Sequence, residues 1–167
     1  MGKTRYMRLR GSRHLRQRLV LATLTATPIV VEEIHSDDTF PGLRPHEVSL
    51  FRLLEKITDH SFGRSCYTSR VLIGGKNLVH DCGLSRSIGY FLEPLILLGL
   101  FGKKPLSIRL KGVTNDSKDP SVDTFRTTTL HMLKRFGVPL EGLELKIESR
   151  GAPPLARRGP SSSSYHP

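Results

Sequence analysis

The chain has 167 residues, enough for one well-formed core or for one domain with a loose tail. Hydrophobic residues make up 37% and charged residues 25%, a composition typical of folded proteins and not of disordered or fibrous ones. No stretch approaches the roughly 20 apolar residues that span a bilayer, and residues 1–20 lack the apolar segment of a secretory signal. We therefore expect no membrane anchor and no secretion.

The net charge of +11 is unevenly distributed along the chain. Seven of the 26 lysines and arginines lie in the first 18 residues, and no acidic side chain precedes Glu32. Such a basic segment attracts polyanions, because each phosphate that it neutralises releases condensed counterions. Contact with a nucleic acid is the favoured interpretation. A solvated terminus and an anionic membrane surface are the alternatives.

Two segments of the chain show the same order of expected elements. The first opens with an apolar helix over 14–26 and a β-branched strand over 29–34. A polar loop then leads to a helix over 45–60. Pro45 suits the first position of this helix, because proline lacks the N–H that this position leaves unbonded.

The second segment repeats that order with a helix over 87–100, a strand over 106–111 and a helix over 120–136 that Pro120 opens. A closing strand is expected over 143–147. The prolines that precede the strands are 77 residues apart, and those that open the second helices are 75 apart. This agreement predicts an α/β fold built from a duplicated helix–strand–helix–strand unit. The alternative is an unrelated α/β domain with ordinary proline spacing.

These elements suggest four parts: a basic N-terminal arm over 1–10, a first repeat over 11–75, a second repeat over 76–150 and a disordered tail over 151–167. Residues 61–86 are less regular, with one strand expected over 67–73. The tail is rich in proline and serine, so it cannot bury enough apolar surface to become ordered.

Signatures of catalysis are mostly absent, including the common phosphate loops, zinc-protease motifs and nucleophile elbows. Cys66 and Cys82 lack the spacing of a zinc site and are expected to be core thiols in a reducing compartment. The tripeptide at 80–82, His-Asp-Cys, is interpreted as a turn, since adjacent residues of a strand point to opposite faces. Two aspartate clusters, at 37–38 and at 116, 119 and 123, are favoured as caps and turns over Mg²⁺ ligands.

Two loops are better suited to binding, because each follows a strand and precedes a helix of the repeat. Arg44 stands just before a helix N-terminus, which attracts anions. Lys111 and Asn115 belong to the equivalent loop of the second copy. The candidate contacts to RNA phosphates are Arg13, Arg16, Arg18, Arg44, Lys111 and Asn115, and a plain turn is the alternative for each loop. No catalytic residue and no metal ligand is predicted.

Several motifs occur in the order found in RNA 3′-terminal phosphate cyclases and their cyclase-like relatives. They are PGLRP at 41–45, GG at 74–75, GYFLEPL at 89–95, KGVTND at 111–116, DPSVD at 119–123 and RGAPP at 150–154. The chain resembles this family over roughly residues 11–155. The resemblance implies helices packed on one face of small sheets, truncated here after two repeats.

Within that family, the chain is more similar to the cyclase-like branch. True cyclases carry an EGGGQ segment before an arginine, whereas residues 11–16 read GSRHLR and only Arg16 matches. The resemblance implies a nucleolar factor of the small-subunit processome, which acts in pre-rRNA processing toward 18S rRNA. It would bind pre-rRNA, a ribosome-assembly GTPase and processome proteins, without cyclase catalysis, cofactor or membrane. An ATP-dependent RNA 3′-terminal phosphate cyclase and an inactive truncated fragment are the alternatives.

The chain also departs from the family pattern. The family's nucleophilic histidine falls beyond residue 167, and the strand pair before Gly74 is expected to be shortened. After Pro154 the family continues with a GGGEV strand, whereas residues 155–159 read LARRG and a serine run follows. This predicts a truncation or a change of reading frame, which the coding DNA would test.

Overall fold

The computed structural model describes residues 6–62, 66–72, 74–102, 105–139, 142–152 and 164–166. The chain forms two compact units. Unit 1 comprises Met1–Gly75 with Leu97–Pro105, and unit 2 comprises Lys76–Ile96 with Leu106–Pro167. No helix in the described ranges is long and apolar enough to cross a bilayer.

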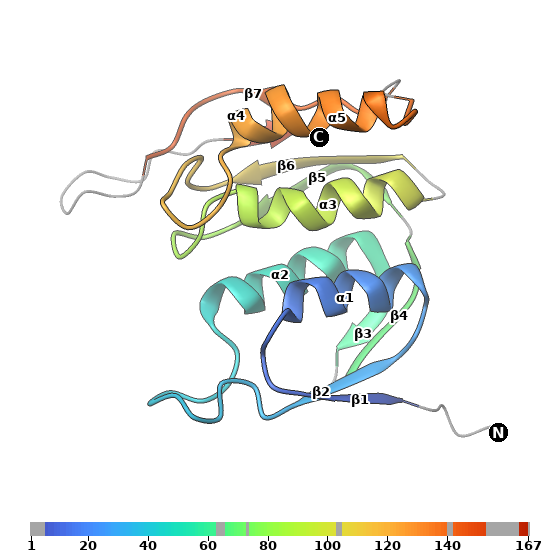
Figure 1. Cartoon of the computed structure of the whole chain (residues 1–167), viewed down its shortest axis with the longest axis vertical. Coiled ribbons are helices and arrows are strands. Elements are labelled where there is room, and N and C mark those ends of the chain that lie inside the picture. Colours follow the sequence, from blue (N-terminus) through green and yellow to red (C-terminus); the bar gives the residue numbers. More distant parts are fainter. Residues whose placement is uncertain are drawn as a thin grey trace. The chain divides into compact units, whose positions relative to one another are not determined.

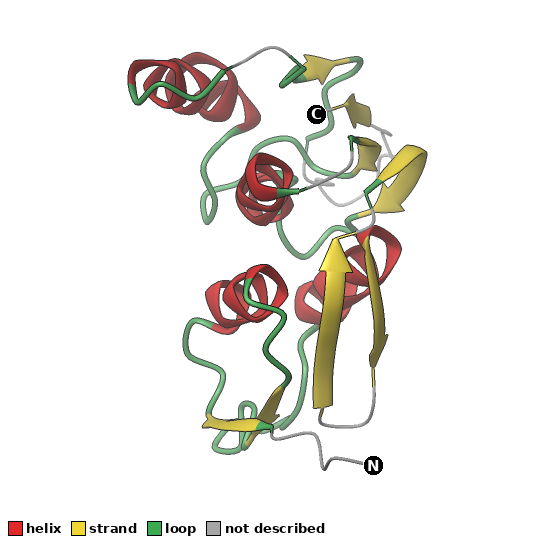
Figure 2. Cartoon of the chain, turned by 90° about the vertical axis from the view of Figure 1, so that its right-hand side faces the viewer, coloured by secondary structure: helices red, strands yellow, loops and turns green. Residues whose placement is uncertain are grey.

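Unit 1 combines a four-stranded sheet with two helices. Its elements are β1 (Met7–Arg10), α1 (Leu15–Leu24), β2 (Ile29–Glu32), α2 (Pro45–Ile57), β3 (Thr58–Phe62) and β4 (Cys66–Leu72). The strand order is β1-β2-β4-β3. β1 and β2 are parallel, and β4 is antiparallel to both β2 and β3. The two helices lie side by side on one face of this sheet (Figures 1 and 2).

Helix α2 shows how the local sequence sets the boundaries of an element. It begins at Pro45, as predicted, and it buries Leu50, Leu53 and Ile57 completely. It ends at Ile57 and not at residue 60, because Thr58 is extended and its hydroxyl donates a hydrogen bond to the Leu54 carbonyl. Residues 58–60, which the sequence prediction placed in the helix, instead form the start of β3. Strands β3 and β4 pair in antiparallel register, so a strand pair does precede Gly74. That this pair is shorter than in the family stays a prediction.

Unit 2 repeats this arrangement. Its elements are β5 (Gly75–Asp81), α3 (Gly89–Phe101), β6 (Leu106–Lys111), α4 (Val122–Thr124), η1 (Phe125–Thr129), α5 (Leu130–Arg135), β7 (Lys146–Ile147) and β8 (Ser164–His166). Gly75 of β5 and the end of α3 from Leu97 onward are counted with unit 1. The strand order is β5-β6-β8-β7, which matches the order of unit 1 position by position. The predicted α/β fold with duplicated units is confirmed, and each unit gains a strand before its first helix.

The strands that open the units were absent from the prediction. Met7–Arg10 was assigned to the basic arm, but its backbone pairs with Ile29–Glu32 as strand β1. This strand lies at the edge of the sheet, and its alternate arginines are exposed. Its sequence therefore lacks the apolar pattern that predicts a buried strand. In the tail, residues 153–163 and 167 lie outside the described residues. Ser164–His166, predicted to be disordered, pairs with β6 and β7.

The second helix of unit 2 starts later than predicted. Ser121 is the N-cap of α4 and accepts a hydrogen bond from the Thr124 N–H, so Pro120 precedes the helix. The Pro120 carbonyl lies against α3, where a Cβ atom added to Gly89 would be 2.0 Å from the Pro120 oxygen. Only glycine permits this approach of helix and loop.

Candidate nucleic-acid interface

In unit 1 the candidate interface is built at the edge where the parallel strands β1 and β2 end. Loop 11–14 follows β1 and leads to α1, and loop 33–44 follows β2 and leads to α2. The Gly11 N–H donates to the Glu32 carbonyl at 2.9 Å, and Ser12 Oγ lies 3.2 Å from His35 Nδ1. The two loops are therefore joined. In α/β sheets, this carboxyl edge is where ligands bind.

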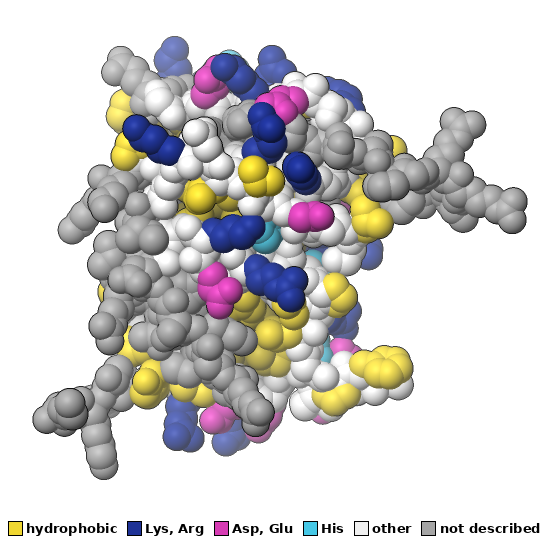
Figure 3. All heavy atoms as spheres, turned by 180° about the vertical axis from the view of Figure 1, so that it is seen from behind, with side chains coloured by type: hydrophobic (Ala, Val, Ile, Leu, Met, Phe, Trp, Pro, Cys, Tyr) yellow, Lys and Arg dark blue, Asp and Glu magenta, His cyan; other side chains and the backbone are white. Residues whose placement is uncertain are grey.

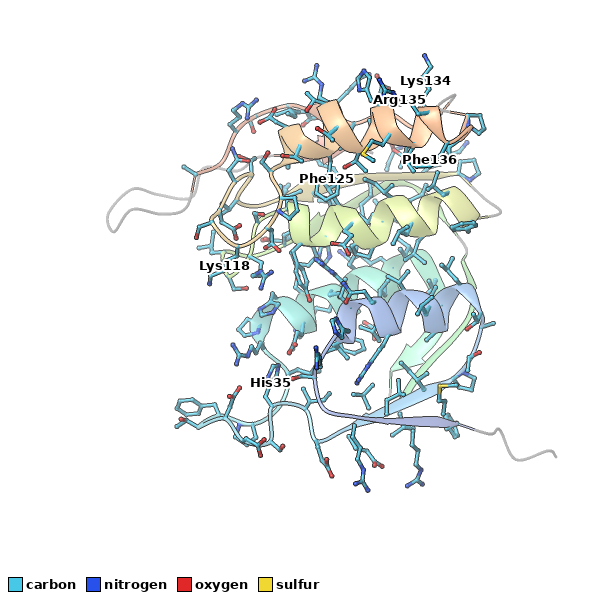
Figure 4. All side chains as sticks on the ribbon, viewed as in Figure 1. His35, Lys118, Phe125, Lys134, Arg135 and Phe136 are labelled. Carbon is cyan, nitrogen blue, oxygen red and sulfur yellow. The ribbon has the colours of Figure 1, made fainter. Side chains whose placement is uncertain are left out.

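His35 is the centre of this edge. Its Nε2 atom lies 3.0 and 3.1 Å from the two carboxylate oxygens of Glu47, and its Nδ1 lies 3.3 Å from Asp38 Oδ2. Glu47 is buried and also accepts the Arg44 N–H at 2.8 Å. One carboxylate therefore caps helix α2 and holds the imidazole of the preceding loop, where Figure 4 labels His35.

The backbone at this edge is locally strained. His14, Glu33 and His35 have φ values of 57°, 57° and 49°, in the left-handed region that side chains other than glycine rarely adopt. Strain of this kind gathers at ligand clamps and functional loops, where the surrounding contacts hold it. Here the contacts of Ser12 and Glu47 with the His35 side chain stabilise the strained backbone at His35.

The three arginines predicted near α1 have different surroundings. Arg13 is exposed, and its Nε donates to His14 Nε2 at 3.2 Å. Arg16 is half-buried on α1. Arg18 donates from Nη1 to the carbonyls of Arg10 and Gly11, at 3.1 and 2.8 Å. Arg18 therefore fixes the turn between β1 and α1, and of the three Arg13 is the most accessible to a phosphate.

Arg44 is the N-cap residue of α2, as the sequence predicted. Its Nη2 donates to Asp38 Oδ2 at 2.7 Å, with 52% of the arginine side chain and 44% of the aspartate side chain exposed. An ion pair this open is weak in water. Arg44 can therefore exchange Asp38 for a phosphate at little cost.

The equivalent edge of unit 2 carries Lys111 and Asn115. Lys111 is the last residue of β6, and both side chains are exposed. Backbone hydrogen bonds join the loops here, from the Cys82 N–H to the Lys111 carbonyl at 2.8 Å and from the Ile88 N–H to the Val113 carbonyl at 2.7 Å. Lys111 therefore lies at the carboxyl end of its strand, whereas Arg44 lies at the other end of its loop, next to helix α2.

Asp116 ties the unit 2 loops together. Its carboxylate accepts hydrogen bonds from the N–H groups of Ser87, Lys118 and Asp119 at 2.8 to 3.0 Å. Burial raises the pKa of Asp116, but these three donors and the nearby Arg86 lower it, and the net pKa lies below the ordinary value. The carboxylate thus stays ionised as the cap of its own loop.

The other two aspartates of that cluster are held by arginines. Asp119 makes a bidentate pair with Arg86 at 2.5 and 2.6 Å, and Asp123 makes one with Arg150 at 2.6 and 2.9 Å. The hydrogen bond from Arg150 lowers the pKa of Asp123, although burial opposes it. Among the described residues, no group of three or more His, Cys, Asp or Glu side chains is placed to hold a metal ion.

The His-Asp-Cys tripeptide at 80–82 is part of the core and turn of unit 2. The His80 ring packs 5.8 Å from the Phe91 ring, and the Asp81 carboxylate accepts the Gly83 N–H at 2.9 Å. Cys82 is buried, and burial together with the Asp81 charge raises the pKa of its thiol. A thiol in this state is a poor nucleophile.

Sequence reasoning missed His35, Glu47 and Arg86 as residues that organise the two edges. One signal was present for Glu47, which stands three residues after the N-cap Arg44, the spacing of a capping box. His35 and Arg86 gave no such signal. Their partners Ser12 and Asp119 are 23 and 33 residues away along the chain.

Comparison with known proteins identifies the family. The profile of the family described as RNA 3′-terminal phosphate cyclase matches residues 7–160. The chain belongs to this family. Its resemblance to the cyclase-like branch agrees with the names of similar curated proteins.

Three relatives illustrate the similarity. A probable RNA 3′-terminal phosphate cyclase-like protein of Arabidopsis thaliana is 63% identical over 154 residues, which cover 88% of this chain and 41% of the relative. The human RNA 3′-terminal phosphate cyclase-like protein is 48% identical over 150 residues, 86% of this chain and 40% of its own length. An rRNA processing protein of Saccharomyces cerevisiae is 37% identical over 158 residues, with 90% and 42% covered. The chain thus spans about two fifths of these relatives.

Proposed function

We propose that the chain acts in rRNA processing as a non-catalytic, RNA-binding factor. The observation that carries this proposal is that relatives in two yeasts, 47% and 37% identical to the chain, are named rRNA processing proteins. The finer proposal is a nucleolar protein of the small-subunit processome, which acts toward 18S rRNA. Because the chain covers about two fifths of these relatives, every activity of the longer proteins is part of the proposal.

The RNA contacts are assigned to the two loop edges. Arg13 and Arg44 in unit 1, and Lys111 and Asn115 in unit 2, are exposed beside the carboxyl ends of strands. On the face drawn in Figure 3, the basic side chains of the described residues are interspersed with acidic ones. This distribution favours separate phosphate contacts, which position an RNA without reading its bases. Arg18 supports the loop that carries Arg13, through its hydrogen bonds to the Arg10 and Gly11 carbonyls.

RNA cyclisation is not part of the proposed function. Residues 11–14 read GSRH in place of a glycine-rich segment. The Ser12 side chain of that loop is hydrogen-bonded to His35, and His14 has a left-handed backbone. Because the family's nucleophilic histidine falls beyond residue 167, the cyclase alternative predicts a covalent nucleotide, after incubation with radiolabelled ATP and Mg²⁺, on a protein that includes that histidine. Detection of such an adduct would overturn the non-catalytic proposal.

RNA binding is tested by the salt dependence of affinity for a transcript of the small-subunit pre-rRNA. In the double variant Arg13→Ala/Lys111→Ala, we expect the slope of log Kd against log salt to fall by about 1 for each lost phosphate contact. The matched control is Arg52→Ala/Lys146→Ala, which removes two exposed cations away from the loop edges. Equal slopes for both double variants would contradict the assignment.

Assembly is tested separately in nucleolar extract. The proposed partners are pre-rRNA, a ribosome-assembly GTPase and other processome proteins. We expect the tagged chain to co-sediment with pre-40S particles in a sucrose gradient, and to leave that fraction after ribonuclease treatment. Sedimentation at the top of the gradient with and without ribonuclease would argue against a role in assembly.

A further inference from the structure

Strand β1 forms one edge of the unit 1 sheet and presents backbone groups on its outer side. Its neighbour is β2, the next strand in the order β1-β2-β4-β3 (Figure 1). The N–H groups of Met7 and Gly11 donate to carbonyls of the β2 segment at 3.0 and 2.9 Å. In a parallel ladder, alternate residues bond to the same neighbour. The N–H and C=O groups of Arg8 and the N–H group of Arg10 therefore point away from β2.

This outer edge is suited to a polypeptide strand. It ends at Arg10, whose carbonyl accepts a hydrogen bond from Arg18 Nη1 at 3.1 Å. Among the described residues, the Arg8 backbone has no hydrogen-bond partner on the outer side. Such groups are a template for a further strand, which binds through its main chain. RNA has no ladder of alternating N–H and C=O groups to offer, so these groups favour a protein segment as the ligand.

The two faces of β1 differ in chemistry. Met7 and Leu9 are in register with buried residues of β2, so they lie on the face of the sheet that the helices cover. Arg8 and Arg10 lie together on the other face, with 77% and 78% of their side chains exposed. Their ion pairs with glutamates at the end of β2 are 3.5 and 3.9 Å long and open to water, hence weak. A strand paired with β1 would place every second side chain beside these two arginines.

β1 differs from the equivalent edge strand of unit 2 in how its edge is protected. Proteins protect exposed edges with bulges, prolines or charges. In β5, Asn77 has a φ of 56°, which interrupts the extended backbone. β1 keeps a continuous register over four residue pairs and contains no proline, so of these devices it has the charges alone. Arginines repel a strand that carries cations, but they attract a strand that carries carboxylates.

We propose that the outer edge of β1 is a docking site for an extended acidic segment of another protein, which adds to the sheet as a further strand. Carboxylates of that segment lie beside Arg8 and Arg10, and apolar side chains alternate with them beside Met7 and Leu9. A second copy of this chain is disfavoured as the occupant, since in-register pairing of two β1 strands sets arginine against arginine. The proposal does not depend on the proposed role in rRNA processing.

The test uses the full chain and a fluorescent peptide of about ten residues in which glutamate alternates with valine, which favours a strand. Fluorescence anisotropy is expected to show binding that weakens as salt is added. We expect Arg8→Glu/Arg10→Glu to weaken binding about tenfold or more, because like charges then face each other. The control Arg52→Glu/Arg126→Glu makes the same change in net charge at exposed sites on helical segments. It is expected to change the affinity by less than about twofold.

Backbone pairing is tested by Arg8→Pro, which removes the outward N–H group and leaves the bonds to β2 in place. We expect this variant to bind about fivefold more weakly than Arg8→Ala, which loses the same charge but keeps the N–H. N-methylation of the peptide is an independent test, because alternate residues of a strand direct their N–H groups to opposite edges. Methylation of either every glutamate or every valine is expected to abolish binding, and methylation of the other set to preserve it.

Several outcomes would overturn the proposal. It fails if the peptide does not bind, or if the two methylated peptides behave alike. It fails if Arg8→Pro binds as well as Arg8→Ala while its circular dichroism matches that of the wild type. If Arg8→Pro loses that circular dichroism, the two methylated peptides decide the question. The proposal also fails if Arg8→Glu/Arg10→Glu loses affinity for oligouridylate, or self-association in sedimentation velocity, with peptide binding unaffected.

Discussion

In unit 1 the loops after the first two strands meet through the side chains of Ser12, His35 and Glu47, whereas in unit 2 the equivalent loops meet through Asp116 and the Arg86–Asp119 pair. Both edges share one backbone hydrogen bond at the same position. The Gly11 N–H donates to the Glu32 carbonyl in unit 1, as the Cys82 N–H donates to the Lys111 carbonyl in unit 2. Beyond that bond, the chemistry of the two edges differs.

The same strand order therefore supports an edge whose charges are bound within the fold in unit 2 and an edge that is more open to water in unit 1. In unit 2 the Asp119 side chain is 3% exposed, and the neighbouring Asp116 stays ionised through backbone donors. In unit 1 the ion pair between Arg44 and Asp38 is open to water, and Phe40 extends from the same loop. The Arg44–Asp38 pair of unit 1 can therefore exchange one partner for a ligand, whereas Asp116 and Asp119 of unit 2 are bound by groups of their own loops.

The largest expected effect is loss of the unit 1 carboxylate. Glu47→Ala removes a buried carboxylate that holds both His35 and the Arg44 N–H, and we expect the free energy of unfolding to fall by about 3 kcal/mol. Urea unfolding followed by circular dichroism measures it. Glu55→Ala, at an exposed site on the same helix, is the control and is expected to change stability by less than about 0.5 kcal/mol. Equal effects would mean that His35 does not depend on Glu47.

The closeness of helix and loop in unit 2 is tested by Gly89→Ala. The added methyl group would meet the Pro120 carbonyl oxygen, so α3 or the loop must shift, at a cost of about 2 kcal/mol. Gly99→Ala on the same helix meets no atom within 4 Å. It is expected to stabilise the protein by up to about 1 kcal/mol, because alanine favours helix. The same urea measurement decides, and a neutral Gly89→Ala would refute the close approach.

The two arginine–aspartate pairs provide a matched comparison between the edges. Arg86→Ala leaves the buried Asp119 carboxylate without its bidentate partner and is expected to cost about 2 kcal/mol. Arg44→Ala breaks an exposed pair and is expected to cost less than about 0.5 kcal/mol. Thermal unfolding of both variants checks the order. If Arg44→Ala were the more damaging change, the more open edge would be in unit 2.

The smallest effect is a pH dependence in unit 2. Because the pKa of Asp116 is lowered by folding, its carboxylate stabilises the folded state above the ordinary aspartate pKa of about 4, and that stability is lost as the pH falls through the lower folded pKa. Asp116→Asn is expected to cost about 1 kcal/mol at pH 7. The difference from the wild type should shrink toward zero between about pH 5 and pH 2. A difference that stays constant over this range would contradict the role of the ionised carboxylate.

Much of the fold was predictable because its signals are local. Pro45 marks the start of α2, and the alternation over 106–111 coincides with β6 residue by residue. The strand expected over 67–73 agrees with β4 to within one residue at each end. The edge strand β1 was missed because its partner β2 lies about 22 residues further along the chain, and β3 was missed because residues 58–60 were assigned to the preceding helix. The exposure of Met132 and Phe136 could not be predicted either, since a regular period would place both side chains beside the buried Phe125.

The sequence by itself determined the family, the duplication and the positions of Arg44 before a helix and Lys111 at a strand end, because motif order and proline spacing are properties of the chain alone. The tertiary structure decided which charges are committed to the fold and which are open to a ligand. Arg18 and Arg86 look as available as Arg13 in the sequence, yet they bind a carbonyl pair and a buried carboxylate. The physical reason is that an arginine's role depends on the acceptors that folding brings to it, and these lie up to 33 residues away.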